Sequence, residues 1–155
     1  MVFILRFFSP AFGEIEADES QIFSFPEGLP GFSHLKKFLL IRHRENSPFF
    51  FLIAVEEPEI YFILIEPSQL LADYHVELSS EQQGLLKLFE ETPVLSLNIV
   101  RIPPEAQEMI INLKAPVVFN LHEKIARQVI LEANYPVRYP ISLSKVKEKA
   151  DAGTK

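Results

Sequence analysis

Hydrophobic and polar residues alternate with a period of two in several short segments of the chain. In EIEAD (Glu14–Asp18), Ile15 and Ala17 share one face and the acidic side chains share the other. In VLSLNIVRI (Val94–Ile102), the leucine and isoleucine residues at every second position share a face in the same way. Successive side chains of a β-strand point to opposite sides, so this pattern predicts strands with one buried face.

Two other segments, FFFLIAV (Phe49–Val55) and IYFILI (Ile60–Ile65), are continuously apolar. Such runs predict either central strands that are covered on both faces or strands whose outer face meets a helix or a partner. The remaining predicted strands are short, rich in Phe, Ile, Leu and Val, and bounded by turn-forming residues. They are Val2–Phe8, Gln21–Phe25, Lys37–Arg42, two strands within Met109–Leu121 bent at Ala115–Pro116, Ala126–Glu132 and Tyr135–Ile141.

One segment has helical periodicity instead. Its apolar side chains fall on one helical face: Leu78, Leu85, Leu86 and Phe89. Ser79 and Ser80 are both candidate N-caps, because each is followed three residues later by a glutamine, which is a capping-box pattern. Pro93 ends the helical pattern, and Glu90–Glu91 would lie unfavourably at the C-terminal end of the dipole. We therefore expect a short helix at about residues 80–91, with an end before the two glutamates favoured.

These elements predict a mostly β, small, single-domain and β-barrel-like fold. It would contain about nine or ten short, largely antiparallel strands and one short helix. Strands that recur every ~8–12 residues are typical of a barrel or a sandwich. We assign residues 1–144 to this domain and residues 145–155 to a charged, flexible C-terminal tail.

Composition narrows the possible classes of protein. At 155 residues and 48% hydrophobic, the chain is long enough to bury a core. The absence of cysteine excludes disulfides, thiolate catalysis and cysteine-bound metals, and it fits a reducing cytoplasm. The apolar runs are far shorter than the roughly 20 residues that span a bilayer, so no membrane association is expected. The apolar N-terminus has no leading basic stretch, which favours a strand over a signal peptide.

The formal charge of the chain is −6. Residues 145–155 contain four lysines and two acidic residues, a charge of +2, so residues 1–144 carry −6 − 2 = −8. Such a surface repels phosphate backbones and attracts basic proteins. We therefore expect a basic protein partner and no direct binding of nucleic acid.

The stretch FPEGLPGF (Phe25–Phe32) is the strongest candidate for a phosphate-binding loop, yet its pattern argues against one. Pro30 lies between Gly28 and Gly31 and removes an N–H donor that a phosphate would need. The segment is better explained as a rigid connection, in which the glycines supply positive φ while Phe25, Leu29 and Phe32 pack into the core.

Other catalytic patterns are equally weak. The four histidines lack the spacing of a metal site, and no Gly-x-Ser-x-Gly sequence occurs. We expect no catalytic residues, no cofactor and no metal. Two minor alternatives stay open: a carrier of small molecules or lipids built on a barrel, and an enzyme that uses carboxylates.

Acidic side chains next to aromatic ones are the best candidates for partner binding. Exposed charges contribute little individually, so a binding site would also need apolar groups beside them. Alternatively, the acidic side chains of Glu14–Asp18 form only the solvent-exposed face of a strand and bind no partner. The candidate partner-binding residues are Phe12, Glu14, Glu16, Asp18, Glu56, Glu57, Glu59 and Tyr61.

Several stretches, taken in order, resemble the flagellar assembly factor family FliW. GLPGF (Gly28–Phe32) followed by NLKAP (Asn112–Pro116) is the most specific pair. We expect the residues of these two motifs to be mainly structural: Gly28, Leu29, Pro30, Gly31, Phe32, Asn112, Lys114, Ala115 and Pro116. The other matching stretches are FGEI (Phe12–Ile15), SPFFFL (Ser47–Leu52), FILIEP (Phe62–Pro67), DY (Asp73–Tyr74) and RQVIL…YPVR (Arg127–Arg138).

The resemblance implies a cytoplasmic, non-catalytic protein that is monomeric when free and binds two partners. One is flagellin before its export, and the other is CsrA, a small RNA-binding translational repressor. When flagellin is scarce, such a protein binds CsrA away from its RNA-binding surface and releases the flagellin message for translation. When flagellin accumulates, it occupies the factor and CsrA represses again. The apolar N-terminus departs from the family, and its Phe7 and Phe8 would serve either association or core packing.

Overall fold

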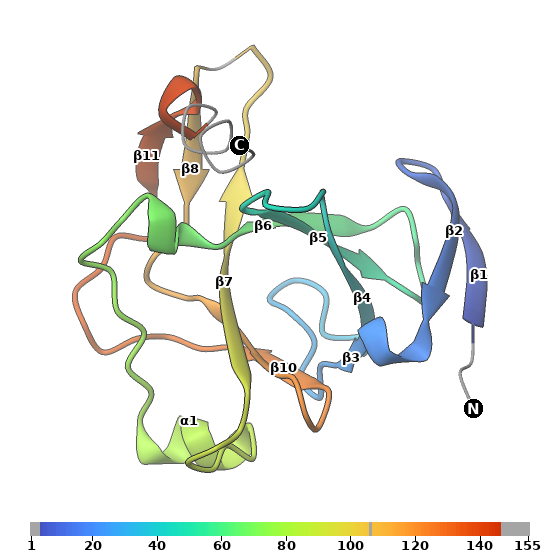
Figure 1. Cartoon of the computed structure of the whole chain (residues 1–155), viewed down its shortest axis with the longest axis horizontal. Helices are drawn as coiled ribbons and strands as arrows, with labels where there is room; N and C mark the ends of the chain where they lie inside the picture. Colours follow the sequence, from blue (N-terminus) through green and yellow to red (C-terminus); the bar gives the residue numbers. More distant parts are fainter. Residues whose placement is uncertain (1–3, 106, 147–155) are drawn as a thin grey trace.

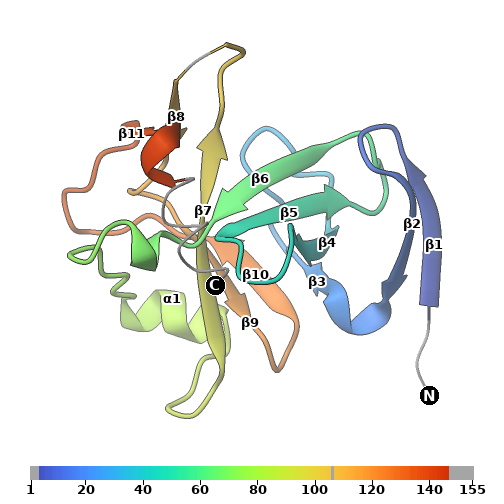
Figure 2. The same cartoon turned by 45° about the horizontal axis from the view of Figure 1, so that its top comes forward.

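Seven strands close into a barrel in this computed structural model, which describes residues 4–105 and 107–146 (Figure 1, Figure 2). Around the barrel the order is β7-β6-β5-β4-β3-β10-β9, and a pairing of β9 with β7 closes the ring. Neighbours are antiparallel except β3 and β10, which are parallel. The bounds are β3 Ile22–Ser24, β4 Lys37–Arg42, β5 Phe49–Ala54, β6 Tyr61–Ile65, β7 Val94–Arg101, β9 Val117–Asn120 and β10 Ile125–Gln128.

Strand β7 is long enough to pair with two successive strands along one edge. Its first half pairs with β9, and its second half pairs with β8 (Glu108–Ile111). Strand β11 (Tyr139–Ser142) extends the sheet beyond β8. The chain must therefore leave the edge of β7 between residues 112 and 116, and Pro116 suits this break because it has no N–H to donate. The predicted division of Met109–Leu121 into two strands is confirmed.

A hairpin of β1 (Ile4–Ser9) and β2 (Gly13–Asp18) packs on the outside of the barrel. The buried face of β2 contacts Leu39 of β4 and Ile53 of β5. This contact explains why β5 is continuously apolar: Leu52 points into the barrel, whereas Ile53 lies under the hairpin. The prediction that this strand is covered on both faces is confirmed.

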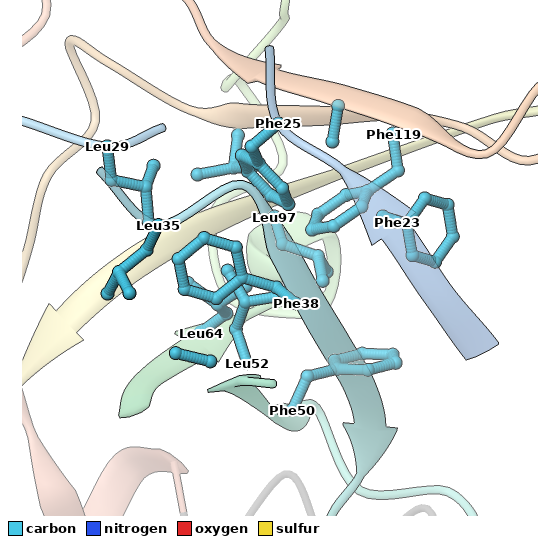
Figure 3. Close-up of a cluster of buried hydrophobic side chains, with 13 residues drawn as sticks. Phe23, Phe25, Leu29, Leu35, Phe38, Phe50, Leu52, Leu64, Leu97 and Phe119 are labelled. Atoms are coloured by element: carbon cyan, nitrogen blue, oxygen red, sulfur yellow. The ribbon is translucent and has the colours of Figure 1, made fainter. Parts of the chain in front are cut away.

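The inside of the barrel is filled mainly by phenylalanine and leucine side chains (Figure 3). Phe25 packs edge-on against Phe38 at 4.8 Å and against Phe119 at 6.0 Å between ring centroids. Phe23 contacts the other side of Phe119 at 5.0 Å. Each fully buried ring stabilises the fold by about 1.5–3 kcal/mol through removal of apolar surface from water. The rings come from β3, β4, β9 and the segment after β3, so the core joins distant parts of the chain.

Helix α1 (Ser80–Leu85) is shorter than the predicted 80–91, and it ends before Glu90 and Glu91, as was favoured. Ser79 is its N-cap, in a reciprocal capping box with Gln82. It ends early because Lys87 adopts φ 55°, which no pattern in the sequence announces. The Lys87 N–H then donates to the Gly84 carbonyl and the Leu88 N–H to the Gln83 carbonyl, which is the pair of bonds that closes many helices.

The fold class is confirmed, with differences in detail. The described residues contain eleven strands where nine or ten were expected, together with 3-10 turns at Glu19–Gln21 and Pro67–Gln69. The predicted strand Ala126–Glu132 ends early, at Gln128. The N–H groups of Val129 and Leu131 still donate in register to the Pro116 and Lys114 carbonyls, but Pro116 has no N–H to donate in return. Likewise, only Tyr139–Ile141 of the last predicted strand, Tyr135–Ile141, pairs in the sheet, as part of β11.

The two ends of the described chain can be compared with the first predicted strand and with the predicted C-terminal tail. Val2 and Phe3 of the first predicted strand lie outside the described residues. Phe7 of β1 is half-buried in the cluster between hairpin and barrel, and Phe8 is exposed. Residues 143–146 form a helical turn, and Val146 is buried beside Ile141 and Leu70. Ordered packing thus reaches Val146, inside the predicted tail of residues 145–155. The remainder of that tail, residues 147–155, lies outside the described residues.

Candidate partner-binding site

The outer face of β2 carries the first group of predicted binding residues. Ile15 and Ala17 point inward and are buried, so alternation places Glu14 and Glu16 on the exposed face. The Arg6 guanidinium lies 3.6 Å from Glu16 across the hairpin, with both side chains largely exposed. An ion pair so exposed contributes little to stability, and both groups stay accessible to a partner.

The tip of this hairpin meets the turn between β5 and β6. The Ser9 hydroxyl donates to the Pro58 carbonyl at 3.1 Å. The Phe12 ring lies 5.0 Å from Tyr61 and 4.8 Å from Phe51 between ring centroids. The structure therefore brings the hairpin tip, just before Glu14, and the turn with residues 56–59 together at an aromatic pair, whereas Asp18 lies at the far end of β2. We call Phe12, Glu14, Glu16, Glu59 and Tyr61 the acidic edge.

Other predicted acidic residues are engaged inside the protein. An Asp18 side-chain oxygen accepts from the Ser20 N–H at 3.0 Å and caps a 3-10 turn. Glu56 accepts from the N–H groups of Lys36 and Lys37 at 3.2 and 3.1 Å. Glu57 lies 2.9 Å from His34. These carboxylates stabilise turns, whereas Glu14 and Glu59 make no hydrogen bond or ion pair with the residues that the structure describes.

The two most specific sequence motifs, GLPGF and NLKAP, line one open pocket of about 540 Å³. Its apolar surface includes Phe62 of β6 and Ile99 of β7. The motif residues that line it are Gly28, Leu29, Pro30, Gly31, Asn112 and Ala115. The barrel thus places two segments that are remote in sequence on either side of one depression. We call this depression the motif pocket.

The GLPGF wall of the motif pocket is a rigid turn. Gly28 and Gly31 have φ of 63° and 83°, as predicted for this segment. The Gly28 N–H donates to the Phe25 carbonyl, and the Phe32 N–H donates to the Leu29 carbonyl. Leu29 is buried in the core, which leaves Pro30 and Gly31 exposed. The interpretation as a rigid connection is confirmed.

The NLKAP wall is held by side chains from several other matching stretches. The Asn112 side chain accepts from the Ala115 N–H at 3.1 Å, and the Lys114 ammonium donates to the Ala133 carbonyl at 2.9 Å. The Tyr74 hydroxyl donates to the Leu113 carbonyl at 2.8 Å and accepts from Asn98. Burial raises the pKa of Tyr74 above its ordinary value of 10.0. The hydroxyl therefore stays protonated and available as a donor at neutral pH.

Strand β10 contributes polar groups to the pocket that the sequence did not single out. Arg127 is mostly buried, and its guanidinium lies 2.7 Å from the exposed carboxylate of Glu27. The Gln128 amide donates to the Ala115 carbonyl at 3.0 Å. The only signal for these residues was their place in RQVIL, one of the stretches that resemble the family. Their bonds tie β10 to both walls of the pocket.

The described residues offer little for other kinds of site. Within residues 4–105 and 107–146, no group of three or more His, Asp or Glu side chains is placed to hold a metal ion. Over the same ranges, none of the helices combines the length and apolar character needed to cross a bilayer.

Comparison with known proteins gives the lineage of the chain. The sequence model of the FliW protein matches residues 7–141. The chain belongs to the FliW family. The flagellar assembly factor FliW of Carboxydothermus hydrogenoformans is 90% identical over 154 residues, covering 99% of this chain and 100% of that protein. The FliW of Clostridium tetani is 40% identical over 130 residues, covering 83% and 90%.

The fold agrees with this FliW assignment. A crystal structure of the flagellar assembly factor FliW matches with a TM-score of 0.80 and 31% identity, over 87% of this chain and 95% of that one. The resemblance drawn from the sequence motifs is therefore confirmed. In this chain, the GLPGF and NLKAP motifs form two walls of one depression. Residues of the DY and RQVIL stretches make hydrogen bonds that hold those walls.

Proposed function

We propose that this member of the FliW family is a cytoplasmic, non-catalytic regulator that binds flagellin and the translational repressor CsrA. Free FliW would bind CsrA away from its RNA-binding surface and relieve repression of flagellin synthesis. Flagellin that accumulates before export would occupy FliW and release CsrA. The 90% identity to a protein named a flagellar assembly factor carries the assignment to flagellar assembly.

The acidic edge is the observation that best supports a basic partner such as an RNA-binding protein. Glu14 and Glu59 are exposed, and each is two residues along the chain from a member of the Phe12–Tyr61 pair. Complementary charge accelerates encounter, while aromatic side chains supply the area that holds a complex together. Tyr61 is 39% exposed, so part of its ring is free to contact a partner.

The alternatives of a carrier or a carboxylate enzyme receive less support. The barrel interior is filled by packed rings and leucines rather than by a ligand cavity (Figure 3). In the motif pocket, the side chains of Asn112, Arg127 and Gln128 are each bonded within the protein. These groups hold the two walls of the pocket together, which is a structural role.

Charge reversal tests the acidic edge. Glu14→Lys combined with Glu16→Lys should slow association with CsrA and flatten the dependence of that rate on salt, because attraction at long range is lost. Stopped-flow or biolayer measurements at several ionic strengths would give both quantities. A matched control, Glu105→Lys with Glu108→Lys, changes the net charge equally at exposed positions in and beside the β7–β8 connection.

The possible results distinguish an error in the assigned binding surface from an error in the proposed function. An association rate at low salt that is unchanged in the Glu14/Glu16 variant, or reduced equally in the control, would remove this edge from the interface. Failure of the wild-type protein to retain either CsrA or flagellin at micromolar concentration would contradict the proposed function itself.

A further inference from the structure

A second surface lies at the junction of α1 and β7, on the side of the barrel away from the β1–β2 hairpin (Figure 1, Figure 2). Three large apolar side chains in this short segment are exposed: Leu85 is 48%, Phe89 81% and Val94 46% accessible. An exposed phenylalanine ring costs free energy in water, and clustered apolar side chains at a surface often mark a binding site.

The exposure of Phe89 is built into the fold. On either side of Lys87, Leu86 is fully buried and Leu88 packs into the cluster that contains Val118 and Leu131. The amide of Asn120, itself fully buried, donates to the carbonyls of Leu86 and Lys87 at 2.8 and 3.2 Å. The same side chain accepts from the N–H groups that follow β9, so it locks the segment to the barrel.

The turn that carries Phe89 is closed by its own hydrogen bonds. The Phe89 N–H donates to the Thr92 hydroxyl at 2.9 Å, and the Thr92 N–H donates back to the Phe89 carbonyl at 3.1 Å. The Leu121 N–H then donates to the Pro93 carbonyl, where β7 begins. The ring is therefore presented on a fixed support, which lowers the entropy lost when a partner binds it.

Charge around the ring defines the partner. Glu81, Glu90 and Glu91 are exposed in this segment, against one lysine, Lys87, which gives a local charge of −3 + 1 = −2. A second copy of the chain would bring two negative surfaces together, and anionic lipid headgroups would be repelled in the same way. A basic protein segment with an apolar side chain satisfies both the ring and the carboxylates.

We propose that Leu85, Phe89 and Val94, with the three exposed glutamates of the same segment, form a docking surface for a basic, apolar-bearing segment of a protein partner. We call it the Phe89 surface. This proposal rests on the proposed function in one respect: the RNA-binding repressor CsrA is the basic protein used first to test it. Phe89 is the anchor, and the carboxylates select positive charge beside it.

The test compares variants of the full chain for CsrA binding by calorimetry and biolayer interferometry. Phe89→Ser should weaken binding about tenfold or more, mainly through faster dissociation. Glu90→Lys with Glu91→Lys should slow association and reduce its salt dependence. The matched control is Val137→Ser, which removes another exposed apolar side chain, 59% accessible, outside this segment. Unchanged affinity in the Phe89 variant, with CsrA still bound, would overturn the proposal.

Further measurements separate this inference from the proposed function. If wild-type FliW fails to bind CsrA, the proposed function fails, and an amphipathic lysine–leucine peptide then probes the surface by NMR. Shifts confined to residues 81–94 and lost in Phe89→Ser support the surface, and their absence overturns it. Two other results would also overturn the proposal of a basic protein segment. Dimerisation that Phe89→Ser abolishes would assign the surface to a second copy of the chain, and Phe89-dependent binding to phosphatidylglycerol vesicles would assign it to a membrane.

Discussion

The two glycines of GLPGF have similar backbone angles but different surroundings. A Cβ at Gly28 would lie 2.6 Å from the Phe32 carbonyl oxygen and 2.8 Å from the Ser33 Cα, whereas a Cβ at Gly31 would meet nothing within 4 Å. Gly31→Ala should therefore cost only the strain of positive φ, about 1–2 kcal/mol. Gly28→Ala should cost clearly more, because backbone atoms must also move.

Denaturant unfolding of both variants would measure this difference in the free energy of unfolding. Equal losses in the free energy of unfolding would mean that the loop relaxes around a Cβ at Gly28, and that the packing of Gly28 against Phe32 and Ser33 is not rigid. The wall of the motif pocket depends on the same packing, so the comparison also tests how firmly that wall is held.

Residue roles were only partly accessible from the sequence. Alternation placed Ile15 inward and Glu14 outward, and the positive φ of Gly28 and Gly31 followed from the turn pattern. Acidic character alone could not tell Glu56, which accepts from two backbone N–H groups, from Glu59, which makes no hydrogen bond with the described residues. That difference depends on which backbone the barrel brings beside each carboxylate.

At the scale of elements, the start of α1 offers a matched pair of substitutions. The sequence left both Ser79 and Ser80 as candidate N-caps, and the structure selects Ser79, whose hydroxyl accepts from the Gln82 N–H at 3.1 Å. Ser79→Ala should lower the free energy of unfolding by about 1 kcal/mol. Ser80→Ala, at the first helical position, should change it little. Thermal or chemical unfolding would measure both, and similar effects would contradict the assigned cap.

Element positions were predicted better than element ends. The break between β8 and β9 was visible in the sequence, because Pro116 cannot donate to a ladder. The end of α1 was not, because Lys87 adopts a backbone conformation that glycine or asparagine would normally signal. The shortened β10 was also missed: its Val129 N–H donates in register to Pro116, which has no N–H to complete the pair, and the sequence does not show which residues face each other.

At the scale of the whole molecule, closure of the barrel explains why the FliW motifs are scattered along the chain. Strand β7 meets β9 and then β8, so the NLKAP bend lies beside the loop that follows β3. Tyr74 and Arg127 arrive at this place from other elements. No periodicity in the sequence reveals that these segments meet, so the motif pocket required the three-dimensional structure.

The β1–β2 hairpin is a separate sheet, attached to the barrel mainly through the cluster around Leu39 and Ile53. Ile15, which is 7% exposed, is the central contribution of β2 to that cluster. Ile15→Ala removes buried apolar area and should cost about 2–5 kcal/mol of hairpin docking. Because the barrel strands stay paired on both sides, the loss should be local.

Hydrogen exchange read by mass spectrometry would locate this loss. We expect amides of β1 and β2 to exchange faster in Ile15→Ala, while those of β4, β5 and β6 keep their protection. Leu52→Ala, at a fully buried position inside the barrel, serves as the control and should reduce protection throughout. Since the acidic edge is assembled by docking of the hairpin, Ile15→Ala should also weaken CsrA binding without changing any charge. Uniform loss of protection in Ile15→Ala would show instead that hairpin and barrel unfold as one unit.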